Sequence, residues 1–490
     1  MQPATSPGSH DRRGAGRADD RVANRADDRA ARVRFRRALT LMLMTLVLPG
    51  SAQLVAGRRD VGRIAMRVWF ATLGTLVLLA AISWVWHGVA LELVLNTKLL
   101  NLIRFAMMIL AVGWAALFID AWRLGQPLTL FRRQRLTAVG VNGLLCFTVA
   151  GALLFGSHLV TVHRDFILAN FGNGPSADPS AGRYNVLLLG GDAGAGRTGL
   201  RPDSITVASI DADSGRTVLV GLPRNLAKFR FAKESVMAEQ FPDGFNCDGC
   251  YLNGVSTWAM DNTELFGKSK NPGVEATIEA VEGITDLEIS YWAMVNLEGF
   301  KDVVDAFGGV ELTVRQPIPV GGLGSDVTGY IKPGTRRLNG HDALWFARAR
   351  EGSDDYSRMA RQKCVMQALA SQVSPTDLIA HYGELTKAGS AMVQTNLPGS
   401  ELKNFMQLAL KAKDQKISTV SIVPPAINTG DPDLAKIKKM VADGIARAEG
   451  EGPKPGKKKA GKAQTINGGS LGTRNEGYQA NESDDLASAC

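Results

Sequence analysis

The sequence predicts an α/β domain with a central mixed β-sheet flanked by helices, preceded by transmembrane helices. Two observations support this prediction. Apolar segments are concentrated in residues 38–165, whereas the rest of the 490-residue chain has the composition of a soluble globular protein. Beyond residue 183, strand-length apolar runs bounded by turn residues alternate with helical stretches, which favours one sheet covered by helices.

Residues 1–37 are rich in Arg, Asp, Ala and Gly and carry few large apolar side chains. Such a segment can bury too little surface to fold, so we expect a disordered cytoplasmic arm. It is also too charged and too long to be the start of a cleaved signal peptide.

Residues 38–165 form the predicted membrane region. A first apolar run, Leu39–Leu48, is interrupted by Pro49-Gly50-Ser51 after about ten residues, half the length of a span. This pattern favours a re-entrant or interfacial segment. Three further runs are each close to the roughly twenty residues that cross the hydrocarbon as a helix; they lie at about 66–87, 99–120 and 137–162.

Charges in the connecting segments predict the orientation. Residues 57–67 and 121–135 contain four arginines each, whereas 87–98 contain one Glu and one Lys. Basic connections are typical of the cytoplasmic side, so three spans place everything after residue 165 outside the cytoplasm. A fourth span would reverse that, but the charges favour three. The expected location is therefore a multi-pass protein of the cell membrane with an extracytoplasmic domain.

The net charge of +9 does not indicate nucleic-acid binding, because much of the excess lies in the arm, in the basic connections and around Lys454–Lys462. We expect a linker at 166–182, a globular domain at 183–443 and a disordered tail at 444–490. The predicted strands are 184–189, 204–210, 217–222, 289–295, 310–314 and 417–423, and the predicted helical segments are 251–283, 297–307, 341–350 and 356–372.

Cys247 and Cys250 lie in one loop, and no second cysteine pair accompanies them to make a zinc site. If the domain is extracytoplasmic, a local disulfide is favoured over redox catalysis. Two free thiols remain the alternative.

Candidate site residues form two clusters, and neither a nucleophile elbow, a P-loop nor an HExxH motif is present. The first cluster is Asp192, Arg201 and Asp203, with Arg224 at the end of a neighbouring strand. Two carboxylates in loops at strand ends can share Mg²⁺, which prefers carboxylate oxygens and keeps waters for phosphate. The alternative is that both Asp side chains cap turns.

The second cluster comprises Arg348, Arg350, Arg358, Arg361 and Gln362, together with Asp354 and Asp355. On a helix, Arg358, Arg361 and Gln362 are spaced i, i+3 and i+4 and are predicted to share one face. Guanidiniums bind phosphate through paired hydrogen bonds and stay charged, so this face suits a polyanion. The alternative is a solvated helix face with Asp–Arg pairs.

The order of these motifs resembles the LytR–CpsA–Psr family over about residues 183–373. The matching strings are NVLLLGGD at 185–192, RPDSITV at 201–207, LPR at 222–224, LNG at 252–254, VVDAFGGV at 303–310, LNGHDALWFARAR at 338–350 and DYSRMARQ at 355–362. The last two are the most specific.

The resemblance implies a membrane-anchored phosphotransferase. It would move a phosphate-linked glycopolymer, such as teichoic acid, capsule or an arabinogalactan-like polymer, from a polyprenyl pyrophosphate carrier to peptidoglycan. It also implies Mg²⁺ (or Mn²⁺) on Asp192 and Asp203, and an apolar tunnel for the prenyl chain. Arg224, Arg348 and Arg350 would be catalytic, and Arg201, Arg358, Arg361 and Gln362 would bind substrate.

One position departs from the family pattern, because Asn225 stands where Pro-Arg-Asp is usual. A missing carboxylate there could change how Arg224 is oriented. It encourages one alternative, a non-catalytic sensor of lipid-linked wall precursors. A polyprenyl pyrophosphatase is a further alternative. The general base stays unassigned.

Overall fold

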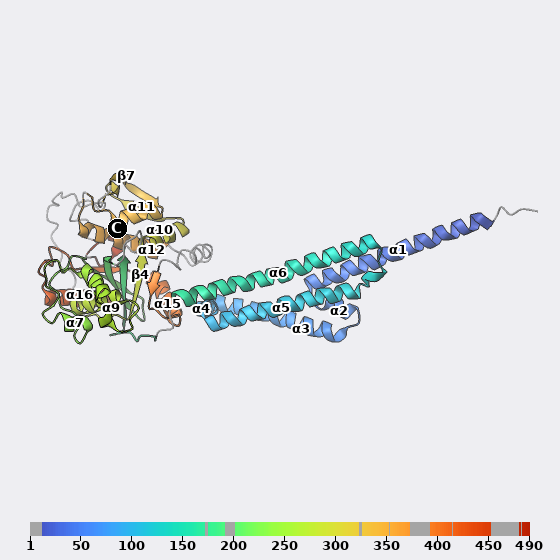
Figure 1. The fold of residues 1–490 in the computed structure, drawn as a ribbon, viewed down its shortest axis with the longest axis horizontal. Helices are drawn as coiled ribbons and strands as arrows, with labels where there is room; N and C mark the ends of the chain where they lie inside the picture. Colours follow the sequence, from blue (N-terminus) through green and yellow to red (C-terminus); the bar gives the residue numbers. More distant parts are fainter. Residues whose placement is uncertain are drawn as a thin grey trace, which may run out of the picture. The chain divides into compact units, whose positions relative to one another are not determined.

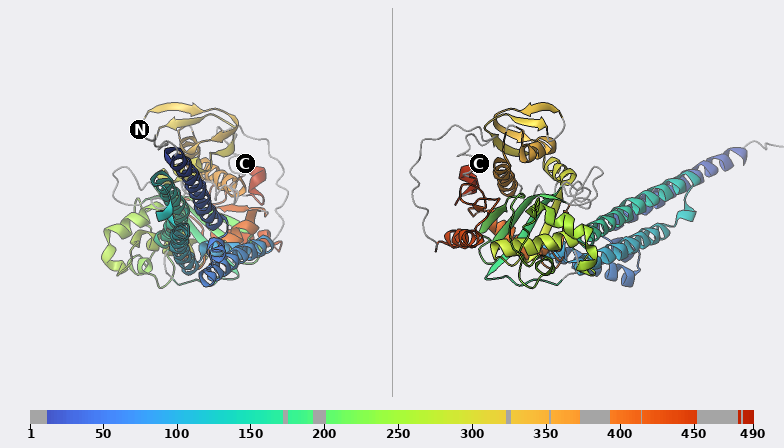
Figure 2. Two further views of the ribbon diagram at one scale, coloured as in Figure 1. Left: turned by 90° about the vertical axis from the view of Figure 1, so that its right-hand side faces the viewer. Right: turned by 60° about the vertical axis from the view of Figure 1, so that its left-hand side comes forward.

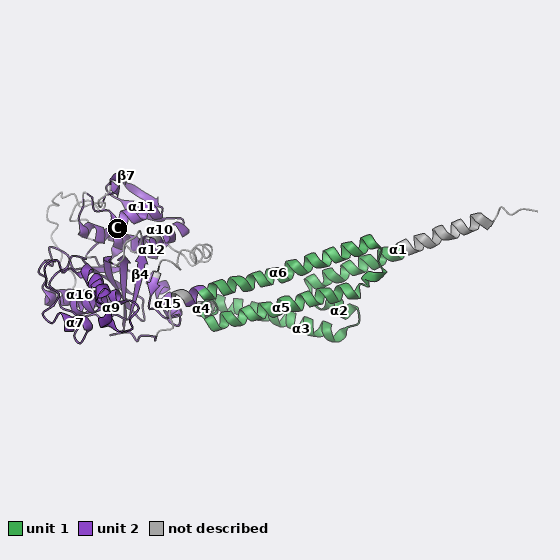
Figure 3. Ribbon diagram, in the orientation of Figure 1, with its two compact units in different colours: residues 1–165 green, residues 166–490 purple. Residues whose placement is uncertain are grey.

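The computed structural model describes residues 12–171, 175–191, 201–322, 326–351, 353–372, 393–413, 415–451, 480–481 and 483–490. The chain divides into two compact units, residues 1–165 and 166–490, coloured separately in Figure 3.

The first unit is helical (Figure 1). Three of its helices, within the part of the chain that the structure describes, are long and apolar enough to cross a membrane, and they correspond to the three predicted spans. Their apolar windows are at most 11% buried inside the protein, as expected for surfaces that lipid would cover. The helices are α1 (Arg12–Val47), α2 (Ser51–Val55), α3 (Arg59–Val85), α4 (His87–Leu95), α5 (Thr97–Leu124), η1 (Pro127–Thr129) and α6 (Arg132–Asn170).

Helix α1 differs from the expected disordered arm, because residues 12–37 are helical and continue into the first apolar run. The physical reason is that Ala and Arg, which dominate this stretch, are strong helix formers even where they bury little surface. The helix ends at Val47, and Gly50 adopts the left-handed conformation (φ 94°) before α2 begins. The interruption that the sequence predicts at Pro49-Gly50 is therefore present in the structure.

The second unit is built on a six-stranded mixed sheet in the order β10-β3-β2-β1-β4-β9. Figures 1 and 2 show helices packed beside this sheet. β2 is antiparallel to both β1 and β3, whereas β4 is parallel to β1 and β10 is parallel to β3. The strands are β1 (Arg183–Gly191), β2 (Pro202–Asp211), β3 (Thr217–Leu222), β4 (Tyr291–Asn296), β9 (Val393–Thr395) and β10 (Ser418–Ser421).

Alternate side chains of the strands enter two different cores. Leu187 and Val220 pack with α8 (Val255–Asp261), α9 (Pro272–Thr285) and α16 (Leu434–Glu449) in the larger core. Leu188 and Leu219 point to the opposite face, where they pack beside α12 (Asp355–Gln372). The predicted α/β architecture, with helices on both faces of one sheet, is therefore confirmed.

A smaller core lies beside α12 and uses two separate ribbons, β5-β8 and β6-β7. The predicted strand 310–314 is β5, but it pairs with β8 rather than joining the central sheet. The elements are α10 (Leu297–Ala306), β5 (Val310–Val314), β6 (Ile318–Gly321), β7 (Val327–Ile331), β8 (Gly334–Leu338) and α11 (Gly340–Arg348).

The remaining elements are α7 (Val236–Gln240), η2 (Leu252–Gly254), η3 (Thr263–Phe266), α15 (Leu402–Lys413) and α18 (Leu486–Ala489). Cys247 and Cys250 form the disulfide that the sequence favours. The predicted disordered tail is contradicted at both of its ends: α16 continues to Glu449, and residues 480–481 and 483–490 pack against the domain. The apolar side chains that they bury offset the cost of ordering them.

Candidate functional site

Strand register brings the first cluster together. Ser204 pairs with Gly190 and Ile205 pairs with Leu222, so the start of β2 lies between the ends of β1 and β3. Asp203 is at this start, and Arg224 lies two residues beyond the end of β3. Antiparallel pairing thus places a carboxylate and a guanidinium from different strands at one sheet edge.

Arg224 links the two predicted clusters. Its Nη1 donates to Asp203 Oδ1 at 2.6 Å, and its Nε donates to Asp355 Oδ2 at 3.0 Å. All three side chains are about a quarter exposed. A planar guanidinium that bonds two carboxylates at once is fixed in orientation.

Asp355, in the first turn of α12, lies among three guanidiniums. Besides Arg224, its Oδ1 is 3.6 Å from Arg350 Nη1 and 3.8 Å from Arg358 Nη2. Burial raises the pKa of Asp355, but Arg358, Arg224 and Arg350 outweigh it and hold the pKa below its usual range. Asp355 is therefore ionised at neutral pH and positions the arginines around it.

Arg358 is only 2% exposed, and its Nη2 also donates to the backbone oxygen of Asp203 at 3.0 Å. Burial holds its pKa below the ordinary value, although Asp355 and Asp203 act to raise it. Its Nε is buried and has no hydrogen-bond partner within the described residues, and the same holds for Arg350 Nε. These donors are suited to a ligand anion.

Arg348, Arg350 and Arg358 line a cavity of about 320 Å³, within the range of small-molecule sites. Asp203, Arg348, Arg350, Arg358 and Gln362 are a group of polar lining residues that we call the mouth; Ser204, Thr206 and Asn296 are polar lining residues outside this group. The other walls are mostly apolar and come from β1, β2, β4, α10, α11 and α12; they include Leu188, Leu189, Ala293, Val295, Leu297, Phe300, Leu344, Ala347, Val365, Met366 and Leu369.

Arg361 differs from the prediction that it shares the face of Arg358 and Gln362. It is 1% exposed, and its Nη2 donates to the backbone oxygen of Ala349 and its Nη1 to Ser353 Oγ. At 3.6 residues per turn, positions 361 and 362 point about 100° apart, on opposite sides of position 358. Arg361 therefore holds the connection between α11 and α12 instead of lining the cavity.

The other predicted residues have different outcomes. Arg201 is exposed immediately before β2, and it is not among the described cavity-lining residues. Arg348 lines the mouth, with its guanidinium 5.7 Å from the centre of the Trp345 ring. Asn225 has a buried side-chain oxygen without a partner in the described part of the chain. Asp192 lies outside the described residues.

Asp355 is the site residue that the sequence analysis did not assign a role. Its signal was its place three residues before Arg358, which allows a pair across one helical turn. Its contacts with Arg224 and Arg350 depend on tertiary structure and give no local signal.

Few possible ligands for a divalent metal lie together among the described residues. Within the described residues, no group of three or more His, Cys, Asp or Glu side chains is placed to hold an ion. Asp203 does line the cavity. Mg²⁺ commonly binds through one or two carboxylates plus substrate phosphate and water, so the donor type fits.

The fold and the site together define an α/β protein with an apolar cavity and an arginine-rich mouth. Residues 172–431, more than half of the chain, match the model of the LytR_cpsA_psr family, and the chain belongs to this family.

Several characterised relatives are transferases. TagV of Bacillus subtilis (strain 168), named polyisoprenyl-teichoic acid–peptidoglycan teichoic acid transferase, is 26% identical over 272 residues, which cover 52% of this chain and 62% of TagV. TagU of Bacillus cereus (strain AH820), which carries the same transferase name, is 31% identical over 170 residues, 32% of this chain and 54% of TagU. The chain thus spans less than two thirds of either relative.

A crystal structure of B. subtilis TagV aligns with a TM-score of 0.40 at 23% identity, covering 56% of this chain and all of that one.

Proposed function

We propose that this protein transfers a phosphate-linked glycopolymer from a polyprenyl pyrophosphate carrier to peptidoglycan, with Mg²⁺ or Mn²⁺ as cofactor. The observation that carries the proposal is the division of one cavity's lining into apolar side chains and the arginines Arg348, Arg350 and Arg358. A polyprenyl pyrophosphate has the same division, a hydrocarbon chain joined to a diphosphate.

The charges at the mouth support an anionic ligand. Arg224, Arg350 and Arg358 bring three guanidiniums to Asp203 and Asp355, and Arg348 lines the same cavity, so positive charge is in excess among these described residues. Arginine is suited to bind phosphate oxygens in pairs and keeps its charge when buried. The apolar walls would stabilise a prenyl chain by about 25 cal/mol per Å² removed from water.

In the proposed reaction, a peptidoglycan hydroxyl oxygen attacks the phosphorus that carries the polymer. The bond from that phosphorus to the bridging oxygen breaks, and polyprenyl phosphate leaves with the bonding electron pair. Arg348, Arg350 and Arg358 stabilise the charge that develops on the phosphate oxygens, the main contribution of a protein to phosphoryl transfer. Asp355 and Arg224 position these groups, and the proton acceptor stays unassigned.

The metal would be held by Asp203, with Asp192 as the second expected carboxylate. When bound, it supplies Lewis-acid polarisation and charge neutralisation at the diphosphate. Asp203 also has a second partner, because Arg224 Nη1 donates a hydrogen bond to its Oδ1. We infer that Arg224 keeps the carboxylate directed toward the cavity.

We also propose that α3, α5 and α6 cross the cell membrane and that the second unit is extracytoplasmic. The arginine-rich connections at 57–67 and 121–135 support the orientation. The disulfides Cys247–Cys250 and Cys364–Cys490 support the same side, because disulfides persist mainly in oxidising compartments.

The test uses the full-length protein in lipid nanodiscs with a polymer-bearing polyprenyl pyrophosphate, a peptidoglycan acceptor and Mg²⁺. We expect wild-type protein to attach polymer to the acceptor. Arg348→Ala should abolish attachment and leave folding largely intact, whereas Arg336→Ala, an exposed arginine on β8, should retain it.

Other outcomes decide against the proposal. Tight binding of the polyprenyl pyrophosphate without product would make the protein a sensor. Asn225, whose buried side-chain oxygen lacks a partner among the described residues, is the feature that favours this alternative. Polyprenyl phosphate released without an acceptor product would make it a pyrophosphatase. Wild-type attachment by Arg348→Ala would remove this arginine from the site.

A further inference from the structure

The described C-terminal residues, 480–481 and 483–490, form what we call the C-terminal strap. They lie along β10, the strand at one end of the sheet order. Thr419 N donates to Ser483 O at 2.7 Å, Ser483 N donates to Thr419 O at 3.3 Å, and Leu486 N donates to Ile417 O at 2.8 Å. The strap therefore covers backbone groups of a strand that would otherwise form an open edge.

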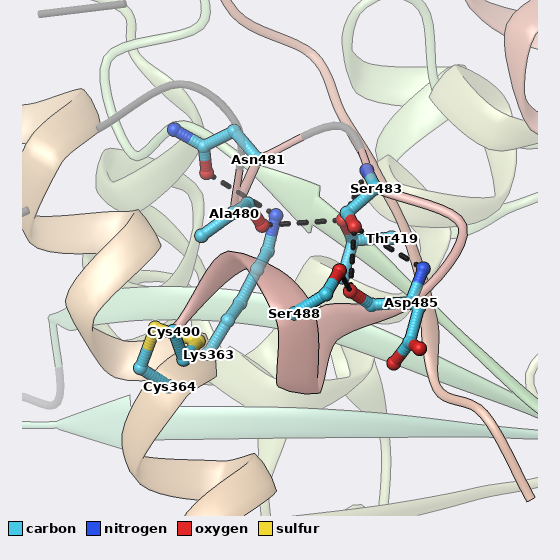
Figure 4. The surroundings of a disulfide bond; sticks show 9 residues. All are labelled: Lys363, Cys364, Thr419, Ala480, Asn481, Ser483, Asp485, Ser488 and Cys490. Carbon is cyan, nitrogen blue, oxygen red and sulfur yellow. Dashed lines mark hydrogen bonds between the residues drawn. A yellow bond between two sulfur atoms is a disulfide. The ribbon is translucent and has the colours of Figure 1, made fainter. Parts of the chain in front are cut away.

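The strap is also bonded to α12 (Figure 4). A disulfide joins Cys490 to Cys364 in the middle of this helix, across 126 residues of sequence. Asn481 Nδ2 donates to the backbone oxygen of Tyr356 at 2.9 Å, and its Oδ1 accepts from Lys363 Nζ at 3.3 Å. The first turn and the centre of α12 are thus both tied to the strap.

Apolar packing connects the strap with the cavity wall. Ala480, Leu486 and Ala489 are buried in one cluster with Ala360 and Cys364 of α12. Leu188 and Met366 pack against the same cluster, and both of them also line the cavity. The strap therefore supports two wall residues from behind.

The cavity and the C-terminal strap contact different faces of helix α12. Arg358, Gln362 and Met366 follow each other at intervals of four residues and line the cavity. Ala360 and Cys364, also four residues apart, contact the strap. Side chains at i and i+4 project from the same side of a helix, so the strap holds one side of α12 while the other side forms the site.

We propose that the C-terminal strap is a redox-held clamp on α12: with the Cys364–Cys490 bond closed, it positions Arg358 and Gln362 at the cavity mouth, and reduction of the bond releases it. The effect on substrate rests on the function proposed above, but the clamp itself does not. Closing the bond removes two electrons and two protons from the thiols and passes them to a disulfide oxidant, which becomes a dithiol. A dithiol reductant reverses this and leaves as its own disulfide.

Lys363 adds a polar consequence of release. Its ammonium is bonded by Ser421 and Asn481, and it lies so close to β3 that a side chain on Gly221 would meet it at 3.0 Å. With the strap released, Asn481 no longer bonds Lys363 and water gains access to this part of α12. The strap therefore shields both Lys363 and the apolar cluster on α12 from water.

The first measurement is hydrogen exchange of the full-length protein in nanodiscs, before and after mild treatment with dithiothreitol. On reduction we expect exchange at residues 356–369 and 417–421 to become faster by about 30-fold, the factor that corresponds to about 2 kcal/mol for a disulfide. Re-oxidation should restore protection. Unchanged exchange in both segments, with Cys364 and Cys490 shown to be alkylated, would overturn the proposal.

Variants separate the two disulfides of the domain. Cys490→Ser should reproduce the faster exchange at 356–369 without reductant. Cys250→Ser, which opens the other disulfide, should leave that segment protected. If Cys490→Ser does not fold, reduction of folded wild-type protein still decides the outcome. Finding Cys364 and Cys490 both free in protein purified without reductant would also overturn the clamp.

A ligand measurement addresses positioning. We expect reduction of wild-type protein to weaken binding of geranylgeranyl pyrophosphate with Mg²⁺ by roughly tenfold, with recovery on re-oxidation. Cys250→Ser without reductant should bind as tightly as oxidised wild type. Equal affinity of the oxidised and reduced forms would contradict positioning of the site by the strap. If the oxidised wild type binds no ligand, the proposed function fails, whereas the exchange result still tests the clamp.

Discussion

Arg358 and Arg361 lie one turn apart on α12 and are equally buried, at 2% and 1% exposed, but their surroundings are different. Arg358 lies near the carboxylates of Asp355 and Asp203 and lines the cavity. Arg361 donates to the backbone of Ala349 and the hydroxyl of Ser353. Burial alone therefore does not mark a functional arginine; charged partners and access to a cavity do.

The guanidiniums of Arg358 and Arg361 differ in which charged groups offset the loss of water around them. Burial lowers the pKa of Arg361 to about 10; the charge of Arg358 adds to this, and Asp354 offsets only part of it. Arg358 is held by a network that includes Asp355, itself bonded by Arg224. A cation in a network with carboxylates keeps its charge at the place where a phosphate would bind.

The largest expected effect is on the site arginine. Arg358→Lys keeps the charge but cannot reproduce the planar fork that reaches Asp203 O, so we expect polymer transfer to fall by about 100-fold. The measurement is the initial rate of attachment with full-length protein in nanodiscs. Arg361→Lys is the matched control, and its folded fraction should retain transfer within a few-fold of wild type. Equal losses of transfer rate in Arg358→Lys and Arg361→Lys would contradict the different roles assigned to the two arginines.

The second effect is on stability and should fall on the other arginine. Arg361→Met leaves the buried oxygen of Ala349 without this donor, which we expect to lower the free energy of unfolding by about 1–3 kcal/mol. Urea titration of the full-length protein, followed by pulse proteolysis of the second unit, gives the value. Transfer per folded molecule should stay near that of the wild type. A variant as stable as wild type would show that the link to Ala349 contributes nothing.

The sequence predicts all five residues of the mouth, but it also groups Arg361 with them and assigns no role to Asp355. Motif order and strand ends indicated Asp203, Arg224, Arg348 and Arg350, and antiparallel pairing of β2 with β1 and β3 explains why reading strand ends succeeded. Arg361 was assigned to the mouth because i and i+3 positions are near each other on a helix. Which of two neighbouring positions enters a cavity depends on the rotation of the helix, and tertiary packing sets that rotation.

The C-terminal strap shows a second limit. Composition gave a disordered tail, and Cys364 and Cys490 carried no sign of pairing because spacing does not determine disulfide connectivity across 126 residues. β5 illustrates the same point, because its residues were correctly read as a strand but their partner β8 follows in a separate ribbon. Local pattern gives the element, and its partner comes from the assembled core.

The smallest expected effect concerns Lys363, the third buried cation of α12, which neither lines the cavity nor pairs with a carboxylate among its described contacts. Burial lowers its pKa from the ordinary value of 10.5 to about 7. Between these values the unfolded chain binds a proton that the native protein has lost, so wild-type stability should rise with pH. Below about pH 7 both states are charged, and the native protein bears the full cost of burying that charge.

Lys363→Met removes this cost. We expect the variant to be more stable than wild type at pH 6 and its advantage to shrink as the pH rises from 7 to 10, by at most about 1.4 kcal/mol per pH unit. The measurement is the difference in the free energy of unfolding between the two proteins at each pH, in which other titrating groups cancel. Lys332→Met, at an exposed lysine, should give a flat difference. A flat difference for Lys363→Met as well would mean that Lys363 binds its proton equally in both states, and that its burial among Ser421, Asn481 and Gly221 has no electrostatic cost.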